Sequence, residues 1–481
     1  MSLATAQPIR SYPPQARTPL PKRLGELCVI SLLFLSITCP PIPVTSELSI
    51  KVEHVLVLFI VAVYGWLLLA GLAKMFRFNG FFIVGAIYTV AVSISIWYGS
   101  AILNHSSLLR DYYEIPKLWL PIAFFTLAYE SELSEASLRR LLKYIAAAVL
   151  LVCLYGWAQF LNLGFTHTLN TYYSGGAHHD RSLEILRRVY STMGNPNVLG
   201  ELMAWMLMVY IMAFLFKVGN RFLNVAVALS CLATIVMTAS RYALLMALLA
   251  FGLILALATT ALKKRAAQIA LLVLILVPIF VATFLAIELK NQSTMQRFDA
   301  LKHPLEVESL RERMDKIWVE AVYYYELSPW VGHGPAKALF IDVWDDCEYL
   351  GILKRYGTVG FFPYIAYYLF PMFLIWKGLR AAHQRAGPLM EDRIPATYMA
   401  MRMGFAMTVM ALVMNIGMST FSNDELQAFL WLWLGLAARA AQTVVEASNA
   451  DPQMFRVPRV VAFAKDRLAR QPLTPRWTRA T

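Results

Sequence analysis

Arginine and carboxylate side chains gather in two polar stretches and one short turn of an otherwise apolar sequence. Arginine suits phosphate or pyrophosphate because its planar guanidinium donates paired hydrogen bonds and keeps its charge. Carboxylates repel phosphate, so they indicate a second task, the acceptance of a proton or of a hydrogen bond from a hydroxyl. Together these residues predict a transferase that moves a group from a lipid pyrophosphate onto a hydroxyl. The arginines are Arg187, Arg188, Arg241, Arg311 and Arg313, and the carboxylates are Asp345, Asp346 and Glu348.

The elements that must hold these residues are membrane helices. The chain of 481 residues has a mean hydropathy of +0.55, with 58% hydrophobic and 15% charged residues, which is far too apolar for a soluble protein of this size. Its apolar runs are about 20 residues long and there are about twelve of them, which predicts an all-α polytopic membrane protein. They lie near 26–44, 54–73, 80–103, 115–129, 141–162, 197–216, 222–239, 242–261, 268–287, 357–376, 397–417 and 426–444.

Positive charge between the spans gives the orientation. Lysines and arginines gather in alternate loops, so these loops and both termini are predicted to be cytoplasmic. This topology accounts for much of the net charge of +13, and no motif indicates nucleic-acid binding. The predicted organisation is a disordered cytoplasmic tail (1–23), a transmembrane domain (24–444) with external loops at about 164–195 and 288–346, and a basic cytoplasmic tail (445–481).

Local signals place several arginines at helix ends. Asn195 followed by Pro196 is typical of a helix start, because asparagine caps free amides and proline fits the first helical position. The apolar stretch 222–262 is long enough for two spans, which predicts a tight external turn from Thr238 to Arg241.

A helix is also predicted in the longer external loop. Ser309 and Glu312 have the spacing of a capping box, and Pro329 ends the helical pattern that follows. Arg311 and Arg313 then stand on the first turn of this helix. Its apolar face is predicted to pack on the spans or to lie in the membrane interface.

Simpler interpretations stay open for each of these residues. The arginines can contact lipid headgroups, and the carboxylates can cap the next span, whose start favours negative charge. Glu201, about one turn inside a span, is either functional or a stabiliser of the helix start. His333, in a glycine-flanked turn, is more typical of a loop residue than of a ligand or base. The five cysteines are scattered, and no spacing favours a metal site.

Four motifs in a fixed order carry a family resemblance. They are "RVYSTMGNPNVLG", "TASRYALLMALLA", "SPWVGHGP" after an arginine-bearing helix, and an acid-Tyr-Leu segment that ends in "RYGTVG", all within residues 185–365. This order resembles the O-antigen ligase and O-antigen polymerase superfamily. The resemblance implies a bacterial inner-membrane glycosyltransferase. Such an enzyme takes a glycan from an undecaprenyl-pyrophosphate carrier at the periplasmic face, with inversion at the anomeric carbon and with no metal or other cofactor.

The resemblance also implies roles for individual residues. Arg188, Arg241 and Arg313 match family arginines and would hold the pyrophosphate. Ligases carry His-Asn-x-Tyr-Leu before the tenth span, where this chain has Asp346 in the position of the histidine, and this favours a repeat-unit polymerase over a ligase. The predicted site comprises Asp346 and Glu348 as catalytic residues, Arg187, Arg188, Arg241, Arg311, Arg313 and Arg355 at the pyrophosphate, and Asn195, Asn197 and Tyr349 as further substrate contacts.

The predicted partners follow from this chemistry. They are an undecaprenyl-pyrophosphate-linked glycan donor, a lipid-linked glycan or lipid A core acceptor, bilayer lipids, and a chain-length regulator or other polysaccharide assembly proteins. A ligase is the first alternative. A transporter or flippase of a lipid-linked or anionic solute is the alternative from another class, although the sequence has no repeated halves of the kind that many transporters show.

Overall fold

The structure, a computed structural model, describes a large part of the chain. The ranges that it describes are 20–43, 49–69, 80–131, 133–173, 188–258, 263, 267–268, 311–340, 347–386, 395–418 and 424–450. Arg187, Asp345, Asp346 and all but the first residue of the predicted span at 268–287 lie outside these ranges. Helices enter both predicted tails, since α1 begins at Leu20 and α19 ends at Ala450.

The described residues form helices almost throughout, as predicted. A short antiparallel pair of strands, β1 (Pro41–Pro43) and β2 (Ser49–Lys51), joins the first two helices. The helices are α1 (Leu20–Thr38), α2 (Val52–Leu69), α3 (Gly80–Ala101), α4 (Leu109–Tyr112), α5 (Glu114–Glu130), α6 (Glu135–Phe160), α7 (Phe165–Tyr173), α9 (Pro196–Leu215), α10 (Arg221–Met237), α11 (Arg241–Leu257), α15 (Trp318–Leu327), α16 (Glu348–Ala386), α18 (Pro395–Met414) and α19 (Asp424–Ala450), with short helical turns at Ser191–Met193 and Arg313–Ile317.

The helices confirm an integral membrane protein with several spans. Among the described residues, six helices are long and apolar enough to cross a membrane, namely α3, α6, α9, α16, α18 and α19. Four shorter apolar helices coincide with further predicted spans, at Gly25–Thr38, Val52–Val63, Arg221–Met237 and Arg241–Leu257. The total of about twelve therefore stays a prediction.

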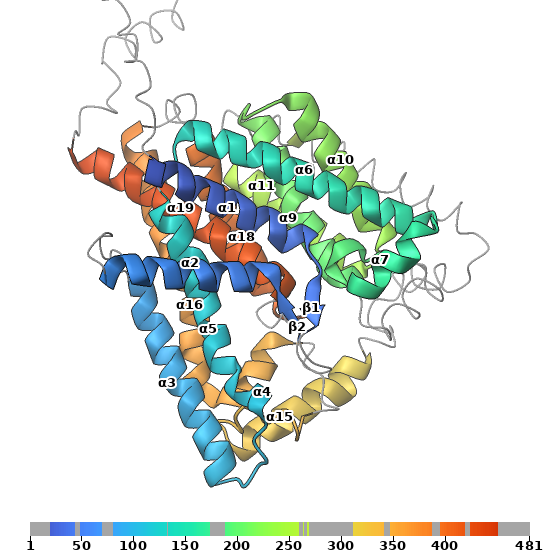
Figure 1. The fold of residues 1–481 in the computed structure, drawn as a ribbon, viewed down its shortest axis with the longest axis vertical. Helices are drawn as coiled ribbons and strands as arrows, with labels where there is room; N and C mark the ends of the chain where they lie inside the picture. Colours follow the sequence, from blue (N-terminus) through green and yellow to red (C-terminus); the bar gives the residue numbers. More distant parts are fainter. Residues whose placement is uncertain are drawn as a thin grey trace, which may run out of the picture.

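Helix α9 lies at the centre of one half of the bundle and packs against α10, α11 and α18. It is buried on all sides, with only Asn197 and Phe214 outside the buried set, which is what a helix apolar around its whole circumference requires. A second core joins α3, α5, α16 and α19 through aromatic rings. There the ring of Phe81 lies 4.7 Å from Phe125, 5.2 Å from Tyr367 and 5.6 Å from Trp431. Helices α3, α5 and α16 extend to one end of the molecule, where α4 and α15 also lie (Figure 1).

Candidate functional site

The start of α9 and the turn between α10 and α11 form a single hydrogen-bonded unit. Asn195 caps α9, accepting from the amide of Asn197 at 2.8 Å, and the predicted helix start is thereby confirmed. The Oδ1 atom of Asn197 accepts hydrogen bonds from Arg188 Nη2 and from Ser240 Oγ, both at 2.8 Å. Arg188 Nε also donates to the carbonyl of Thr238 at 3.0 Å. The guanidinium of Arg188 is thus fixed between the first turn of α9 and the end of α10.

The first turn of α11 packs tightly against α9. Ser240 caps α11, so the predicted turn from Thr238 to Arg241 is confirmed. A Cβ added to Gly200 would lie only 2.3 Å from the Cβ of Ala243, so the two backbones approach more closely than a larger residue would allow. This contact brings Glu201, whose side chain is fully buried, beside the start of α11.

Two further arginines meet at this point. Arg241 is the first residue of α11, and Arg313 lies in the helical turn that leads into α15. Their guanidinium groups repel one another, and Tyr242 interacts electrostatically with both Arg313 and Glu201. Two like charges held together are stabilised by an anion placed between them. The geometry therefore suits a ligand with more than one negative charge.

The end of α18 holds the carboxylate-bearing start of α16 next to the arginines. A helix ends with carbonyls that have no partner inside the helix, and here other elements supply the donors. Three groups donate to this turn: the hydroxyl of Tyr242 to Met414 at 2.6 Å, the hydroxyl of Tyr349 to Leu412, and the amide of Glu348 to Asn415 at 2.9 Å. Residues far apart in sequence are thereby held at one end of the bundle.

The side chain of Glu348 lies in an enclosed position. It is fully buried and interacts electrostatically with the buried tyrosines Tyr356, Tyr364 and Tyr368. A carboxylate so enclosed is poorly placed to meet an incoming sugar. Asp346, two residues earlier, lies outside the described residues, so its predicted role stays a prediction.

A second polar cluster lies at the start of α5, and it includes Arg355. Glu114 forms an ion pair with Lys337, with 2.5 Å between Oε1 and Nζ, and also interacts with Arg355. Lys337 is further fixed by its amide, which donates to Asp111 at 3.0 Å, and by its carbonyl, which accepts from Arg110 at 3.0 Å. Lys337 thus ties the loop after α15 to α4 and α5 through its side chain and its backbone. The structure places Arg355 in this cluster, and its predicted contact with pyrophosphate stays untested.

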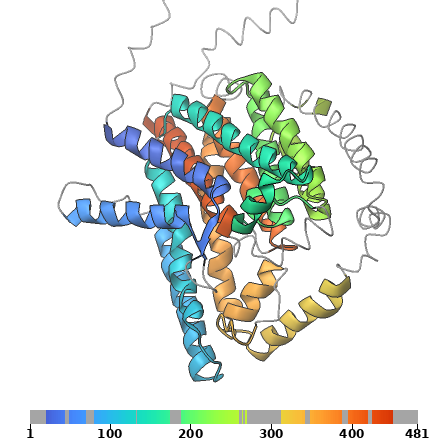
Figure 2. The ribbon, with the colours of Figure 1, turned by 45° about the vertical axis from the view of Figure 1, so that its right-hand side comes forward.

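A break in α16 lets the loop after α15 pack into the helix. Gly357 has φ 59° and ψ −168°, a conformation that is essentially restricted to glycine. The amides of Thr358 and Val359 donate to Pro329 and Trp330 at 2.9 and 3.1 Å. On the other side of the break, the amides of residues 333 and 334 donate to the carbonyls of residues 354 and 355 at 3.2 and 2.8 Å. This pairing explains how "SPWVGHGP" and "RYGTVG" act as one structural unit, with α15 beside the first part of α16 (Figure 2).

His333 joins three elements in this unit. Its Nε2 donates to the carbonyl of Tyr324 in α15 at 2.8 Å, because a carbonyl can only accept. Its Nδ1 is then an acceptor in the neutral ring and lies 3.0 Å from Nε2 of His105, in the loop after α3. Burial lowers the pKa of both imidazoles, and each is lowered further by a neighbour, His333 for His105 and Lys354 for His333. The folded structure therefore favours the neutral form of both imidazoles.

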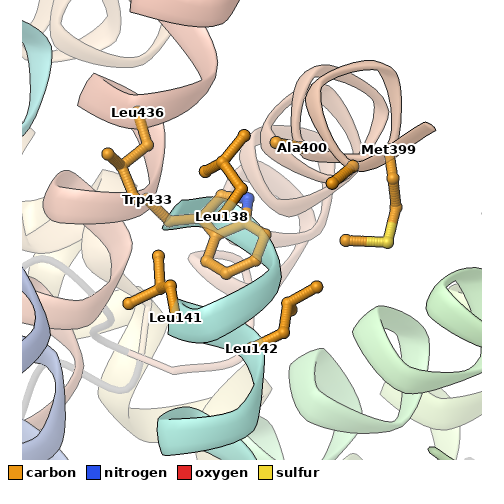
Figure 3. Close-up of a pocket in the computed structure, with 8 residues that line it drawn as sticks. Leu138, Leu141, Leu142, Met399, Ala400, Trp433 and Leu436 are labelled. Atoms are coloured by element: carbon orange, nitrogen blue, oxygen red, sulfur yellow. The ribbon is translucent and has the colours of Figure 1, made fainter. Parts of the chain in front are cut away.

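The hollow between α6, α18 and α19 carries no such chemistry. It is lined by apolar side chains, among them Leu138, Leu142, Met399 and Trp433 (Figure 3). Within the described residues, no group of three or more His, Cys, Asp or Glu side chains could hold a metal ion. The arginine-rich end of the bundle is therefore the candidate site.

The sequence predictions and this geometry agree in part. The structure brings Arg188, Asn197, Arg241 and Arg313 together, while Arg311 has an exposed side chain on the same turn as Arg313. Sequence reasoning missed Ser240 and Tyr242 as members of the site. Both flank Arg241, which ends the predicted external turn, and this position is the signal that could have identified them.

Comparison with known proteins supports one kind of chemistry at the level of the family. Residues 225–365 match the family model for O-antigen ligase. The resemblance inferred from the sequence is confirmed over this segment, which includes Arg241, Arg313, α15 and the break at Gly357 and ends before α18 begins. No curated protein matches the chain. The match supports glycan transfer of the O-antigen ligase and polymerase type, with lipid-linked glycans in the membrane as substrates.

Proposed function

We propose that this protein polymerises lipid-linked repeat units of a bacterial surface polysaccharide at the periplasmic face of the inner membrane. The donor is a glycan on undecaprenyl pyrophosphate, and the acceptor is a sugar hydroxyl of a second lipid-linked unit. The observation that carries the proposal is the pair Arg241 and Arg313, which lies in the segment matched by the family. Both tails are proposed to lie in the cytoplasm.

The transfer is a single displacement in this proposal. The acceptor hydroxyl attacks the anomeric carbon, a new C–O bond forms, and the bond to the pyrophosphate breaks with inversion. The electron pair leaves with undecaprenyl pyrophosphate, whose growing charge Arg188, Arg241 and Arg313 stabilise. Asp346 takes the hydroxyl proton. A weak base such as a carboxylate is sufficient here, because undecaprenyl pyrophosphate is a good leaving group. Glu348 and Tyr349 hold the start of α16 in place.

Polymerase is favoured over ligase by Asp346, which occupies the position where the ligases of the superfamily carry histidine. The ligase alternative rests on the description of the matched family as O-antigen ligase. A chain-length regulator is a proposed partner of the polymerase, because a polymerase by itself has no evident means of counting repeat units.

The test is reconstitution of the purified protein in vesicles with lipid-linked repeat units, without ATP and with a chelator. A ladder of longer lipid-linked glycans supports polymerase activity. Transfer to added lipid A core, with no ladder, indicates the ligase. Movement of the lipid-linked unit across the vesicle membrane, with no change in its length, indicates the transporter class.

A further inference from the structure

Among the described residues, helix α11 presents an exposed stripe that begins one turn after Arg241. Leu245 and Leu248 are 59% and 56% exposed, and Gly252 and Ala256 are also exposed. With Arg241, these positions are spaced by four, three, four and four residues, so they share one face of the helix. The opposite face is buried and packs mainly on α9.

The side chains of the stripe become smaller along the helix, from leucine to glycine and alanine. Below the two leucines, a Cβ added to Gly252 would have no other atom within 4 Å, so the surface there is open. From Leu245 to Ala256 the stripe covers about 16 Å along the helix axis, roughly half the thickness of the hydrocarbon layer.

We infer that this stripe holds the hydrocarbon chain of the lipid pyrophosphate, an inference that rests on the proposed function. A pyrophosphate bound at Arg241 and Arg313 fixes the first isoprene units of its own chain within reach of the next turn of α11. The chain is tethered there at a high effective concentration, whereas any other lipid must arrive from the bulk. The arginine and the stripe together select a long-chain lipid pyrophosphate over a soluble one.

Helix α3 supplies a matched control. It carries a similar exposed stripe, formed by Ile83, Ile87, Val90, Ile94 and Trp97 with exposures between 44% and 61%. The helix contains no arginine. General contact with membrane lipid is therefore expected on both stripes, and selective contact with a lipid pyrophosphate only on α11.

The experiment places a benzophenone amino acid at Leu248 or at Val90 in the full-length protein. Each variant is irradiated in phospholipid vesicles that contain a few per cent of undecaprenyl pyrophosphate as the probe. We expect the adduct with the probe to be enriched about tenfold or more at Leu248 over Val90, each normalised to its phospholipid adduct. Equal enrichment at the two positions overturns the inference.

Two variants separate this inference from the proposed function. Gly252→Phe adds a ring to the stripe at a position where the added Cβ meets no other atom within 4 Å. It is expected to raise the KM for the lipid-linked donor about three- to tenfold, while Val90→Phe has no effect. An unchanged KM for Gly252→Phe contradicts the inference.

If the probe binds and Arg241→Lys weakens its binding, but no adduct forms at Leu248, only the inference fails. If the probe does not bind the wild-type protein, both fail.

Discussion

Arg188 donates a hydrogen bond of 2.8 Å through Nη2 to the Oδ1 atom of Asn197. The bond joins the stretch before α9 to the first turn of that helix. Because Oδ1 also accepts from Ser240, one amide oxygen orients an arginine and the cap of α11 together. The arginine site therefore depends on a side chain that carries no charge.

Asn197→Ala should remove this common acceptor. We expect a loss of about tenfold to a hundredfold in kcat/KM, because misplaced charged groups stabilise a transition state poorly. The free energy of unfolding should fall by about 1 to 2 kcal/mol. Chain elongation in vesicles at matched protein amounts measures the first effect, and thermal unfolding in detergent the second.

Asn224→Ala is the control for Asn197→Ala. Asn224 is buried and donates through Nδ2 to the carbonyl of Val218 at 2.8 Å, at the opposite end of α10 from the site. The Asn224→Ala variant should lose a similar amount of stability and keep its turnover per folded molecule. Equal losses of turnover in both variants would reduce Asn197 to a structural residue.

Gly357→Ala should destabilise the unit formed by α16 and the loop after α15. A Cβ at this position would lie 2.4 Å from the carbonyl oxygen of Trp330, in a backbone conformation that alanine avoids. We expect a loss of at least about 2 to 3 kcal/mol, seen as a lower midpoint of thermal unfolding. Gly252→Ala, inside α11 where the added Cβ meets nothing, should keep or slightly raise the midpoint, because alanine favours a helix over glycine. A tolerated Gly357→Ala would argue against the break in α16.

The histidine pair predicts a loss of stability in mild acid. Both pKa values are lowered in the folded protein, so below about pH 6.5 the unfolded chain takes up protons that the folded chain does not. The contribution of the pair is therefore complete above about pH 6.5 and declines as the pH falls through the lower pKa values of the folded state. Protonation of Nδ1 of His333 would also remove the acceptor for His105.

Thermal unfolding measured between about pH 7.5 and 5.5 checks this prediction. His105→Asn should flatten the decline, because one of the two coupled groups is gone. His383→Asn, at an exposed position on α16, should keep the wild-type profile. A wild-type profile for His105→Asn would show that the decline arises elsewhere.

Asp346→Asn distinguishes a base from a helix cap. If Asp346 takes the proton of the acceptor, turnover should fall by about 10² to 10⁴, with binding of the donor largely intact. Asparagine caps a helix about as well as aspartate, so a pure cap should lose very little. The length distribution of the lipid-linked product, at matched membrane abundance, is the measurement. Full-length product from Asp346→Asn would contradict the role of Asp346 as the base.

Local signals were sufficient to predict several elements from the sequence. Asn195 and Pro196 start α9, and a turn separates α10 from α11, because capping residues and span length act over a few residues. Helix α15 ends at Leu327, just before Pro329, for the same reason. The number of spans was harder to test, since α10 and α11 have only 17 residues each.

The tertiary contacts of the site could not be predicted in this way. The carbonyls at the end of α18 that receive Tyr242 and Tyr349 lie far from both residues in the chain, and no spacing rule connects them. The sequence predicts Arg355 at the pyrophosphate from its position after the carboxylates. Its position beside Glu114 depends on how α5 packs against α16, and only the folded structure supplies that arrangement.

The most direct test of the account compares Arg241→Lys with Arg355→Lys in the vesicle elongation assay. Lysine keeps the charge but loses the planar fork that binds pyrophosphate through paired hydrogen bonds. Arg241→Lys should therefore lower kcat/KM for the lipid-linked donor by about a hundredfold while the protein inserts normally. Arg355→Lys should retain most activity, because it lies in the cluster with Glu114. Near-normal elongation by Arg241→Lys would contradict a pyrophosphate site at the start of α11.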